Sequence, residues 1–465
     1  MSNPLAPTWR TAPGDPNALH SGVWPASAKR ESSGELSVGG VLVKDLVSHY
    51  GTPLLVVDES DLRDRARTVL KAVHQACEKH GVSGSVYYAS KSLTTGHVVQ
   101  WIVSEGLGFD VASGGELAIA LAGGADPATI EFQGNNKSLE EIRQAIKTGV
   151  GTIVLDAPIE ADRVEQVAAE LGVVQNVMVR VNTGVHADTH EYLATAREDQ
   201  KFGLSPTEAS ALVSSLRTRA SLRCVGLHSH IGSQIFAVEG FKEAATRLMA
   251  LYAELLAEGE PLSLNLGGGF GIAYTDADEP MDITELITQI VDHVADQAKT
   301  LGVPMPNLSF EPGRVISGPA GVTLYTAGVT KSVQVTLEDG SHATRLYVSV
   351  DGGMSDNARP ALYGAHYSAR IAQRSSGAPA ALVRVVGKHC ESGDIVVNAE
   401  YLPGDVEPGD VVAVATTGAY CHSLASNYNV VPRPAMVWVN GSKHGVMVQR
   451  ETIADVLRLD QGLSG

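Results

Sequence analysis

The stretch from Ser85 to Thr95 reads SVYYASKSLTT, and it ends an apolar, β-rich run on a single lysine, Lys91. In an α/β barrel or a doubly wound sheet, the residue just past the carboxyl end of a strand lies in the ligand crevice, where the strands behind it limit its access to water. Partial desolvation disfavours the charged form of an amine and favours condensation with an aldehyde. We therefore interpret Lys91 as a candidate Schiff-base lysine, although most lysines that end a strand are solvated charges.

Short β-rich runs alternate with longer segments of helical period on both sides of this stretch. From Ser85 onward these runs are VYYAS, GFDVA, TIEFQ, TIVLD, VMVRVN, CVGLHSHIG, LSLNLGG and LSFEPG. Eight strands of this kind close a (β/α)₈ barrel, and most of the runs end in polar residues or glycines suited to a catalytic face. The pattern predicts a (β/α)₈ barrel, with an open parallel sheet as the alternative.

The rest of the chain predicts additional units around the barrel. Past Arg314, β-rich segments are separated by Gly, Pro, Asp and Asn with little helix between them, which predicts a C-terminal β-sandwich or β-barrel domain. We place the barrel at residues 51–316, with PLLVVDE as its opening strand, and the β domain at residues 317–465. Residues 36–50 are expected to join the β domain. Residues 1–35, rich in Pro, Ser, Ala and Gly, are expected to be a flexible arm.

Composition and charge narrow the class of protein. A chain of 465 residues exceeds the size at which a single core stops growing, so at least two domains are expected. The formal charge of −17 disfavours a nucleic-acid partner. The sequence has no apolar run of the ~18 residues that a membrane span needs and no secretory signal, so we expect a cytoplasmic protein without a membrane partner. The four cysteines, Cys77, Cys224, Cys390 and Cys421, are far apart and suggest neither a zinc site nor a disulfide framework.

The glycine-rich segment NLGGGFGI, residues 265–272, follows the run LSLNL. Adjacent glycines leave backbone N–H groups unobstructed by Cβ atoms, so such a loop can wrap a phosphate. The segment resembles a dinucleotide-binding GxGxxG motif, but no helix opens directly after it and no acidic residue follows in a βαβ unit. A phosphate loop and a plain glycine-rich turn both remain open.

The segment EPGRVISGPAG begins at Glu311, at the end of the last barrel-like run. A carboxylate at this position could hold a proton on a heteroaromatic nitrogen. The Pro-Gly turn and Arg314 could donate to a phosphate or a carboxylate. A surface turn with one ion pair is the alternative.

The segment HSHIGSQ places His228 and His230 two residues apart, so on an unbroken strand both side chains point to the same face. With Asp110 and Asp156 as further donors, this spacing could hold a metal ion. An imidazole stacked on a flat ligand is a second interpretation. A buried histidine with satisfied hydrogen bonds is the commonest interpretation of the motif in isolation.

Together these motifs resemble the diaminopimelate decarboxylases, a family of pyridoxal 5′-phosphate (PLP) enzymes of the alanine-racemase-like fold type. The resemblance spans residues 36–446 and rests on motifs that occur in the family's order: YYASK, FDVASGGEL, HSHIGSQ, NLGGGFG, EPGR, DGGMSDNARPALYGA, CESGD and GAYCHSLASNYN. It implies decarboxylation of meso-2,6-diaminopimelate at its D centre to L-lysine and CO₂, the last step of lysine biosynthesis. It also favours a cofactor-stacking histidine and no metal.

The resemblance further implies roles for single residues. Lys91 would bind PLP covalently, and His230 would stack on the pyridine ring. Glu311 would keep the ring nitrogen protonated, so that the ring accepts electrons and decarboxylation is favoured over racemisation. The other residues implied to hold the cofactor are Ser233, Gly269, Pro312, Gly313, Arg314 and Tyr420.

For the substrate, the resemblance implies that Arg314, Arg359 and Tyr363 bind the distal carboxylate, with Tyr420 nearby, and that Glu391 binds the distal amine. Cys390 would donate a proton to the reacting carbon. Cys390 and Glu391 would act on the active site of the second subunit of a homodimer. The alternatives are a related decarboxylase acting on ornithine, arginine or carboxynorspermidine, and a PLP-binding protein without catalysis.

Overall fold

The computed structural model describes residues 3–185 and 201–463. The chain divides into two compact units. The first, here called the barrel unit, comprises Arg63–Gly271 and Pro280–Val315. The second, the β unit, comprises Met1–Leu62, Ile272–Glu279 and Ile316–Gly465. No helix in the described part of the chain is both long enough and apolar enough to cross a membrane.

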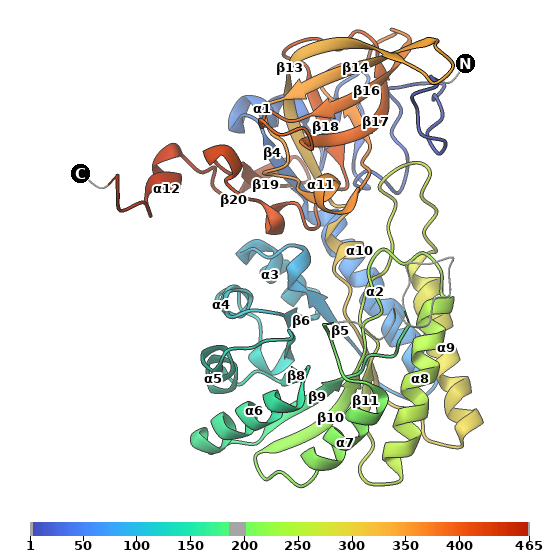
Figure 1. Ribbon diagram of the computed structural model, residues 1–465, viewed down its shortest axis with the longest axis vertical. Helices are drawn as coiled ribbons and strands as arrows, with labels where there is room; N and C mark the ends of the chain where they lie inside the picture. The colour runs from blue at the N-terminus through green and yellow to red at the C-terminus, as the bar shows by residue number, and fades with distance from the viewer. Residues whose placement is uncertain (1–2, 186–200, 464–465) are drawn as a thin grey trace. The chain divides into compact units, whose positions relative to one another are not determined.

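A closed barrel of parallel strands forms the centre of the barrel unit (Figure 1). Its strands are β5 (Gly84–Ala89), β6 (Gly108–Val111), β7 (Ile130–Phe132), β8 (Thr152–Leu155), β9 (Gln175–Arg180), β10 (Leu222–His228), β11 (Ser263–Asn265) and β12 (Leu308–Phe310). Each strand pairs with the next along the chain, and β12 pairs with β5 to close the ring. Each of the eight predicted runs supplies one strand, so the predicted (β/α)₈ barrel is confirmed and an open sheet is excluded.

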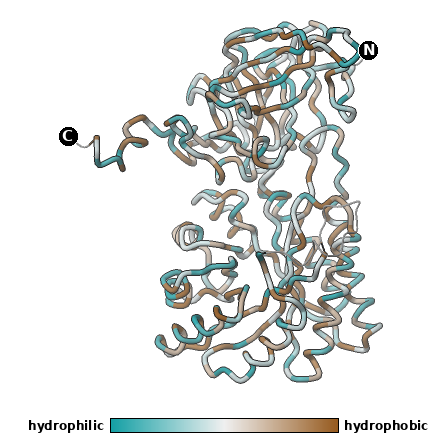
Figure 2. The backbone as a smooth tube through the Cα atoms, viewed as in Figure 1, coloured by the Kyte–Doolittle hydropathy of each residue, from teal (hydrophilic) through white to brown (hydrophobic). Residues whose placement is uncertain are grey.

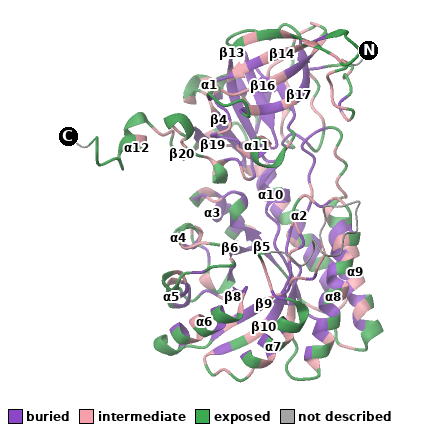
Figure 3. Cartoon of the chain, viewed as in Figure 1, coloured by how far each residue is buried: buried purple, intermediate pink, exposed green. Residues whose placement is uncertain are grey.

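Amphipathic helices surround these strands. They are α2 (Glu59–Glu78), α3 (Gly96–Ser104), α4 (Gly114–Ala122), α5 (Leu139–Thr148), α6 (Pro158–Leu171), α7 (Pro206–Leu216), α8 (Glu239–Leu256) and α9 (Ile283–Leu301). α2 precedes β5, and α3 to α9 follow β5 to β11 in turn. Apolar and polar residues alternate along α8 and α9 (Figure 2), and each of these two helices buries one side and exposes the other (Figure 3). The buried side of α9 carries residues at helical spacing, including Ile287, Ile290, Val291, Val294 and Ala298.

Local sequence sets where several of these helices begin and end. The Ser138 hydroxyl accepts a hydrogen bond from the Glu141 backbone N–H, and the Glu141 carboxylate accepts one from the Ser138 backbone N–H. The two bonds form a capping box at the start of α5. Gly149 ends α5 in the left-handed conformation that glycine adopts without a Cβ penalty. Ser205 and Glu208 form the same box at the start of α7. Each such cap is worth about 1 kcal/mol of helix stability.

The β unit is built on a large mixed sheet. The path runs β17 (Ile395–Pro403), β16 (Ala380–Val386), β14 (His342–Val350), β13 (Gly321–Thr336), β4 (Leu54–Asp58), β19 (Ala435–Asn440) and β20 (Lys443–Val448). β18 (Val411–Ala415) joins it through β13 and also pairs with β15 (Ala369–Ile371). The short helices of this unit are α1 (Val43–Tyr50), α11 (Arg359–Tyr363), η4 (His422–Leu424), η5 (Tyr428–Val430) and α12 (Ile453–Leu457). The predicted second, β-rich domain is confirmed.

The strand PLLVVDE was predicted to open the barrel, and that assignment is wrong. It forms β4, which lies antiparallel to β13 and parallel to β19 in the β unit. All five residues of β4 are buried, and the four before Asp58 are apolar, as in a barrel strand. Its pairing partners, which come from distant parts of the chain, are what place it in the other unit.

The N-terminal segment also differs from the flexible arm expected for residues 1–35. In its described part, Val23 and Trp24 belong to the buried core of the β unit. Arg10 is buried and forms ion pairs with both Asp276 and Glu400. A segment that lacks any periodic pattern is therefore fixed by a few buried anchors.

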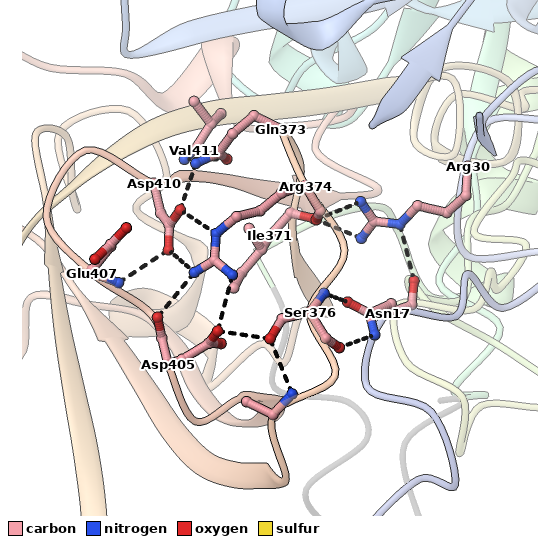
Figure 4. A network of polar contacts seen from close by, with 11 residues as sticks. Asn17, Arg30, Ile371, Gln373, Arg374, Ser376, Asp405, Glu407, Asp410 and Val411 are labelled. Atoms are coloured by element: carbon pink, nitrogen blue, oxygen red, sulfur yellow. Dashed lines mark hydrogen bonds and ion pairs between the residues drawn. The ribbon is translucent and has the colours of Figure 1, made fainter. Parts of the chain in front are cut away.

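Hydrogen bonds attach the same segment to the end of β15 and to the loop that follows it (Figure 4). Arg30 Nη2 donates to the Ile371 carbonyl oxygen at 2.6 Å. The side-chain amide of Asn17 exchanges two hydrogen bonds with the Ser376 backbone, of 2.9 and 3.0 Å. β1 (Lys29–Arg30) then pairs with β2 (Leu36–Val38), and β2 with β3 (Val41–Leu42), in a small antiparallel sheet.

Candidate active site

Lys91 lies in a short 3₁₀ helix, η1 (Ser90–Ser92), directly after β5. Its Nζ atom donates to Asp110 Oδ2 at 3.1 Å, and Asp110 lies beside β5 on the neighbouring strand β6. Burial raises the pKa of Asp110, and the Lys91 charge partly offsets that rise. The Lys91 side chain is 44% exposed, so it is more accessible to water than its strand-end position predicts. The amine therefore lies at the carboxyl end of a barrel strand, within reach of a ligand.

Glu311 follows β12 and is only 4% exposed. Its Oε1 atom accepts hydrogen bonds from Gln133 Nε2 at 2.6 Å and from Asn265 Nδ2 at 2.9 Å, and His228 Nε2 lies 3.1 Å from the same atom. Burial alone would raise the pKa of Glu311, but the charge of His228 and its hydrogen bond outweigh burial and lower the pKa below its usual range. The barrel thus holds an ionised, oriented carboxylate.

His230 lies two residues beyond the end of β10, so it does not share a strand face with His228. Its Nδ1 atom accepts a hydrogen bond from the Gly268 backbone N–H at 3.2 Å. Burial, followed by the charges of Lys91 and Arg180, lowers the pKa of His230 to about 3. The ring is therefore neutral and carries its proton on Nε2, which suits stacking against a flat ligand.

The residues considered above for a metal site, His228, His230, Asp110 and Asp156, are not arranged around a common point in the structure. His228 faces Glu311, and Asp156 accepts from the Gly203 backbone N–H at 3.0 Å with Arg180 Nε 3.9 Å away. Among residues 3–185 and 201–463, no group of three or more His, Cys, Asp or Glu side chains is arranged to hold a metal ion.

The glycine-rich loop after β11 packs closely on its surroundings. Gly267 and Gly269 have φ angles of 68° and 100°, which side chains with a Cβ rarely adopt. A Cβ atom on Gly268 would overlap the Glu311 carbonyl oxygen, and one on Gly269 would overlap the Gly232 carbonyl oxygen. The loop therefore needs glycine for close backbone approach, which is the property that a phosphate cradle uses.

The turn after Glu311 continues this surface. Arg314 Nη2 donates to Ser233 Oγ at 2.7 Å, and the Pro312 carbonyl oxygen accepts from the Ala89 backbone N–H at 3.0 Å. A Cβ on Gly313 would press against Ala89 and Ser92 at 3.0 Å. Arg314 and Ser233 thus lie together, as an anion site would require.

Taken together, the barrel residues fit PLP. They offer an amine at a strand end, a buried carboxylate with fixed orientation, a neutral imidazole, and a glycine-rich loop close to an arginine. Sequence reasoning missed Glu131, Gln133 and Asn265, which form the hydrogen-bond network around Glu311. The signal was available in the run TIEFQ, because Glu131 and Gln133 are polar residues on one face of an otherwise apolar strand.

Apart from Arg314, the candidate substrate residues lie in the β unit. Arg359, on α11, is 6% exposed, and its Nη1 atom donates to Tyr367 Oη at 2.6 Å. The guanidinium also lies over the Tyr274 ring, 4.7 Å from its centroid. Within the described residues Arg359 forms no ion pair with a carboxylate, so a buried positive charge is left for an anionic ligand. Tyr363, at the end of the same helix, is 69% exposed.

Cys390 and Glu391 are both exposed, in the loop between β16 and β17. Asn429 Oδ1 accepts from the Cys390 backbone N–H at 3.3 Å and contacts His389 Nδ1 at 3.1 Å, so this side chain fixes the start of the loop. Tyr420 is half-buried and has a φ angle of 63°. The predicted site residues therefore form two sets, one in each unit, and each set is described by itself.

Comparisons with known proteins place the chain among decarboxylases. Residues 65–318 match the family model described as the pyridoxal binding domain of pyridoxal-dependent decarboxylases. The diaminopimelate decarboxylase of Mycobacterium tuberculosis (strain ATCC 25618 / H37Rv) is 46% identical over 450 residues, which cover 95% of this chain and 98% of the relative. That of Bacillus subtilis (strain 168) is 41% identical, over 93% of this chain and 97% of the relative.

A solved structure has the same architecture. The diaminopimelate decarboxylase of M. jannaschii, in complex with L-lysine, matches with a TM-score of 0.86 and 31% sequence identity. The match covers 94% of this chain and 98% of that chain.

Proposed function

The chain belongs to the diaminopimelate decarboxylase family, and we propose how its residues divide the work of that reaction. The enzyme decarboxylates meso-2,6-diaminopimelate to L-lysine and CO₂ with PLP as cofactor. The observation that carries this conclusion is the identity of 46% to a diaminopimelate decarboxylase over nearly the full length of both chains. The L-lysine bound in the M. jannaschii structure is consistent with the product.

PLP, when bound, supplies an aldehyde that condenses with amines and a conjugated ring that takes up electrons as CO₂ leaves. We assign Lys91 as the residue that binds the cofactor covalently, because its amine is accessible at a strand end and Asp110 holds it by a 3.1 Å hydrogen bond. Asp110 orients the amine and balances its charge. With PLP bound, the Lys91 amine would be the group that the substrate amine displaces.

The other barrel residues orient and tune the cofactor. Glu311 keeps a proton on the pyridine nitrogen, and its orientation by Gln133, Asn265 and His228 supports that role. His230 covers one face of the ring as a neutral imidazole. The other residues that would hold the phosphate and ring are Ser233, Gly269, Pro312, Gly313, Arg314 and Tyr420.

In the β unit, Arg359 binds the distal carboxylate of the substrate. A buried guanidinium without a carboxylate partner among the described residues supports this assignment, because an anion is needed to balance it. Arg314 and Tyr363 complete the contact with that carboxylate, with Tyr420 beside them. Glu391 binds the distal amine, and Cys390 returns a proton to the reacting carbon.

We also propose that the enzyme is a homodimer in which Cys390 and Glu391 act on the partner's site. The support is their exposure in a single chain, since a proton donor must be shielded from bulk water when it acts. A cytoplasmic location remains a prediction from composition.

An assay of CO₂ release tests the substrate assignment. The panel is meso-diaminopimelate, ornithine and arginine, with the Lys91→Ala variant as a blank. We expect release from meso-diaminopimelate alone, because only that substrate offers a distal carboxylate to Arg359. Comparable release from ornithine would replace this assignment with a diamine-forming decarboxylase.

A further inference from the structure

Glu131, on β7, is a carboxyl group that the assignment above leaves without a role. It is 1% exposed. Asn265 Nδ2, on β11, donates to Glu131 Oε2 at 2.7 Å and to Glu311 Oε1 at 2.9 Å. β7 and β11 are not neighbours in the barrel, so this contact crosses its interior. One amide nitrogen therefore bridges two buried carboxyl groups.

More hydrogen-bond donors surround Glu311 than surround Glu131. Glu311 accepts a hydrogen bond from Gln133 Nε2 and contacts His228 Nε2, in addition to the hydrogen bond from Asn265. Glu131 Oε1, in contrast, is buried without a hydrogen-bond partner among the described residues, and so is Gln133 Oε1. A buried carboxylate needs donors for its oxygens, whereas a carboxylic acid supplies a donor itself. The Tyr87 hydroxyl is hydrogen-bonded to Glu131, and Glu131 is also hydrogen-bonded to Glu311, which, as a carboxylate, has no proton to donate. A proton on Glu131 provides the donor for that second contact.

The charges around Glu131 also favour its protonated form. The groups that contribute to the electrostatics of this cluster are the acidic Tyr87, Asp110 and Glu311 and the basic Lys91, Arg180, His228 and His230. Burial, followed by the negative charges of Glu311 and Asp110, raises the pKa of Glu131 well above its usual value. Two adjacent carboxyl groups in a buried site do not both ionise when only one has a strong cationic partner.

We propose that Glu131 is a neutral carboxylic acid that positions Glu311 as the single ionised carboxylate for the pyridine nitrogen of PLP. This inference rests on the role proposed for Glu311. Glu131 acts through Asn265 and Glu311 and is a positioning residue. Each donor to Glu311 lowers its affinity for a proton, so the proton shared with the cofactor stays on the ring nitrogen.

Infrared spectroscopy of the cofactor-free protein tests the protonation state directly. The difference spectrum of wild type minus Glu131→Gln at pH 7 is expected to contain the carbonyl stretch of a protonated carboxylic acid. That band should move to lower frequency in D₂O. Glu140→Gln, at an exposed position on α5, is the matched control and should show ionised-carboxylate bands alone. Ionised-carboxylate bands for Glu131→Gln as well would overturn the proposal. This readout is independent of turnover, so it separates failure of the inference from failure of the proposed function.

Nitrogen NMR of the enzyme loaded with ¹⁵N-labelled PLP tests the positioning role. Glu131→Gln keeps an acceptor for Asn265 and an N–H donor in place of the acid, so its ring-nitrogen shift is expected to match wild type. Glu131→Leu removes the donor, so its shift should move toward that of the deprotonated ring. We also expect kcat for Glu131→Leu to fall on the order of tenfold, with an unchanged KM, as for the loss of one hydrogen bond to a charged group.

A shift in Glu131→Gln equal to that in Glu131→Leu would show that the negative charge matters and would overturn the proposal. An unchanged shift in Glu131→Leu would also overturn it. If Glu131→Leu does not fold, as thermal unfolding would reveal, the infrared result for Glu131→Gln still decides the protonation state.

Discussion

The barrel strand ends carry one set of proposed site residues, and the loop between β16 and β17 carries two residues of the other set, Cys390 and Glu391. The two regions differ in how completely they are built. In the barrel, Glu311 is buried among three donors from three different strands or strand ends. In the loop, Cys390 and Glu391 are exposed. The Cys390 backbone N–H donates to Asn429, and Glu391 Oε1 accepts from the Gly393 backbone N–H within its own loop.

This difference separates two kinds of catalytic group. A group that must keep one charge state throughout the reaction is fixed by buried hydrogen bonds, as Glu311 is, at the expense of stability. A group that exchanges a proton with the substrate has to be close to water at one stage and shielded at another. The exposure of Cys390 fits a residue that is enclosed by another surface when it works.

The largest expected effect tests the barrel side. Lys91→Ala should reduce turnover below detection, because both covalent binding of the cofactor and its transfer to the substrate need the Nζ amine. Borohydride reduction of the wild-type enzyme, followed by peptide mapping, should find the pyridoxyl group on Lys91. Lys299→Ala is the control, because Lys299 is exposed. Lys137 would not serve, since it is buried and paired with Glu160. A label on a different lysine would remove Lys91 from the site.

Mixing two inactive variants tests whether the loop serves a second subunit. If Cys390 acts on the partner, a mixed dimer of Lys91→Ala and Cys390→Ala contains one site with both defects and one with neither. Up to about half of the sites in the mixed dimer then recover. Cys224→Ala, at a half-buried cysteine of the barrel unit, is the control for loss of a thiol and should stay active by itself. A mixture that remains inactive would place each complete site within one chain.

Replacing the buried guanidinium sharpens the comparison within the β unit. Arg359→Leu should raise KM for meso-diaminopimelate strongly, because loss of a desolvated charge pair costs on the order of 2–5 kcal/mol of binding. PLP absorbance should stay normal. Arg384→Leu is a matched control, since Arg384 also lies over a tyrosine ring, 5.8 Å from the Tyr347 centroid. Equal changes in KM for the two variants would point to a packing defect.

The smallest effect concerns stability and pH. Glu131 has a pKa above its unfolded value of 4.5, so the folded state binds more protons than the unfolded state once the pH exceeds that value. Stability should therefore fall as pH rises from about 4.5 to the folded pKa, with a slope of up to about 1.4 kcal/mol per pH unit. Glu131→Gln should remove this slope. Urea unfolding of both proteins without cofactor, from pH 5 to 9, measures it, and parallel curves would contradict a protonated Glu131.

An element could be predicted from the sequence when the residues that determine its place lie close to it in the chain. The eight barrel strands were readable because each has its own apolar run and its own following helix. β4 was assigned to the wrong unit because its partners, β13 and β19, begin more than 250 residues later in the chain. The N-terminal segment was read as flexible because anchors such as Arg10 and Trp24 form no periodic pattern.

The site shows the same division. Lys91, Glu311 and the glycine-rich loop were found because each ends a strand in a chemically suggestive motif. Asn265 was quoted as part of that loop, yet its role depends on Glu131 across the barrel, and no spacing in the sequence reveals that contact. Arg359 was proposed from family resemblance alone, and its burial beside Tyr274 and Tyr367 became visible only in the structure.

The β unit is assembled from both ends of the chain, and this has a consequence for how the protein is made. A ribosome releases the N-terminal residues first, and domains generally fold as they emerge. The strands of the barrel unit emerge as one consecutive block, so the barrel can close while synthesis continues. β4, by contrast, leaves the ribosome long before β13 and β19 exist to pair with it. During that interval a largely apolar strand is unpaired, so the nascent chain should depend on chaperones at its N-terminus more than at its centre.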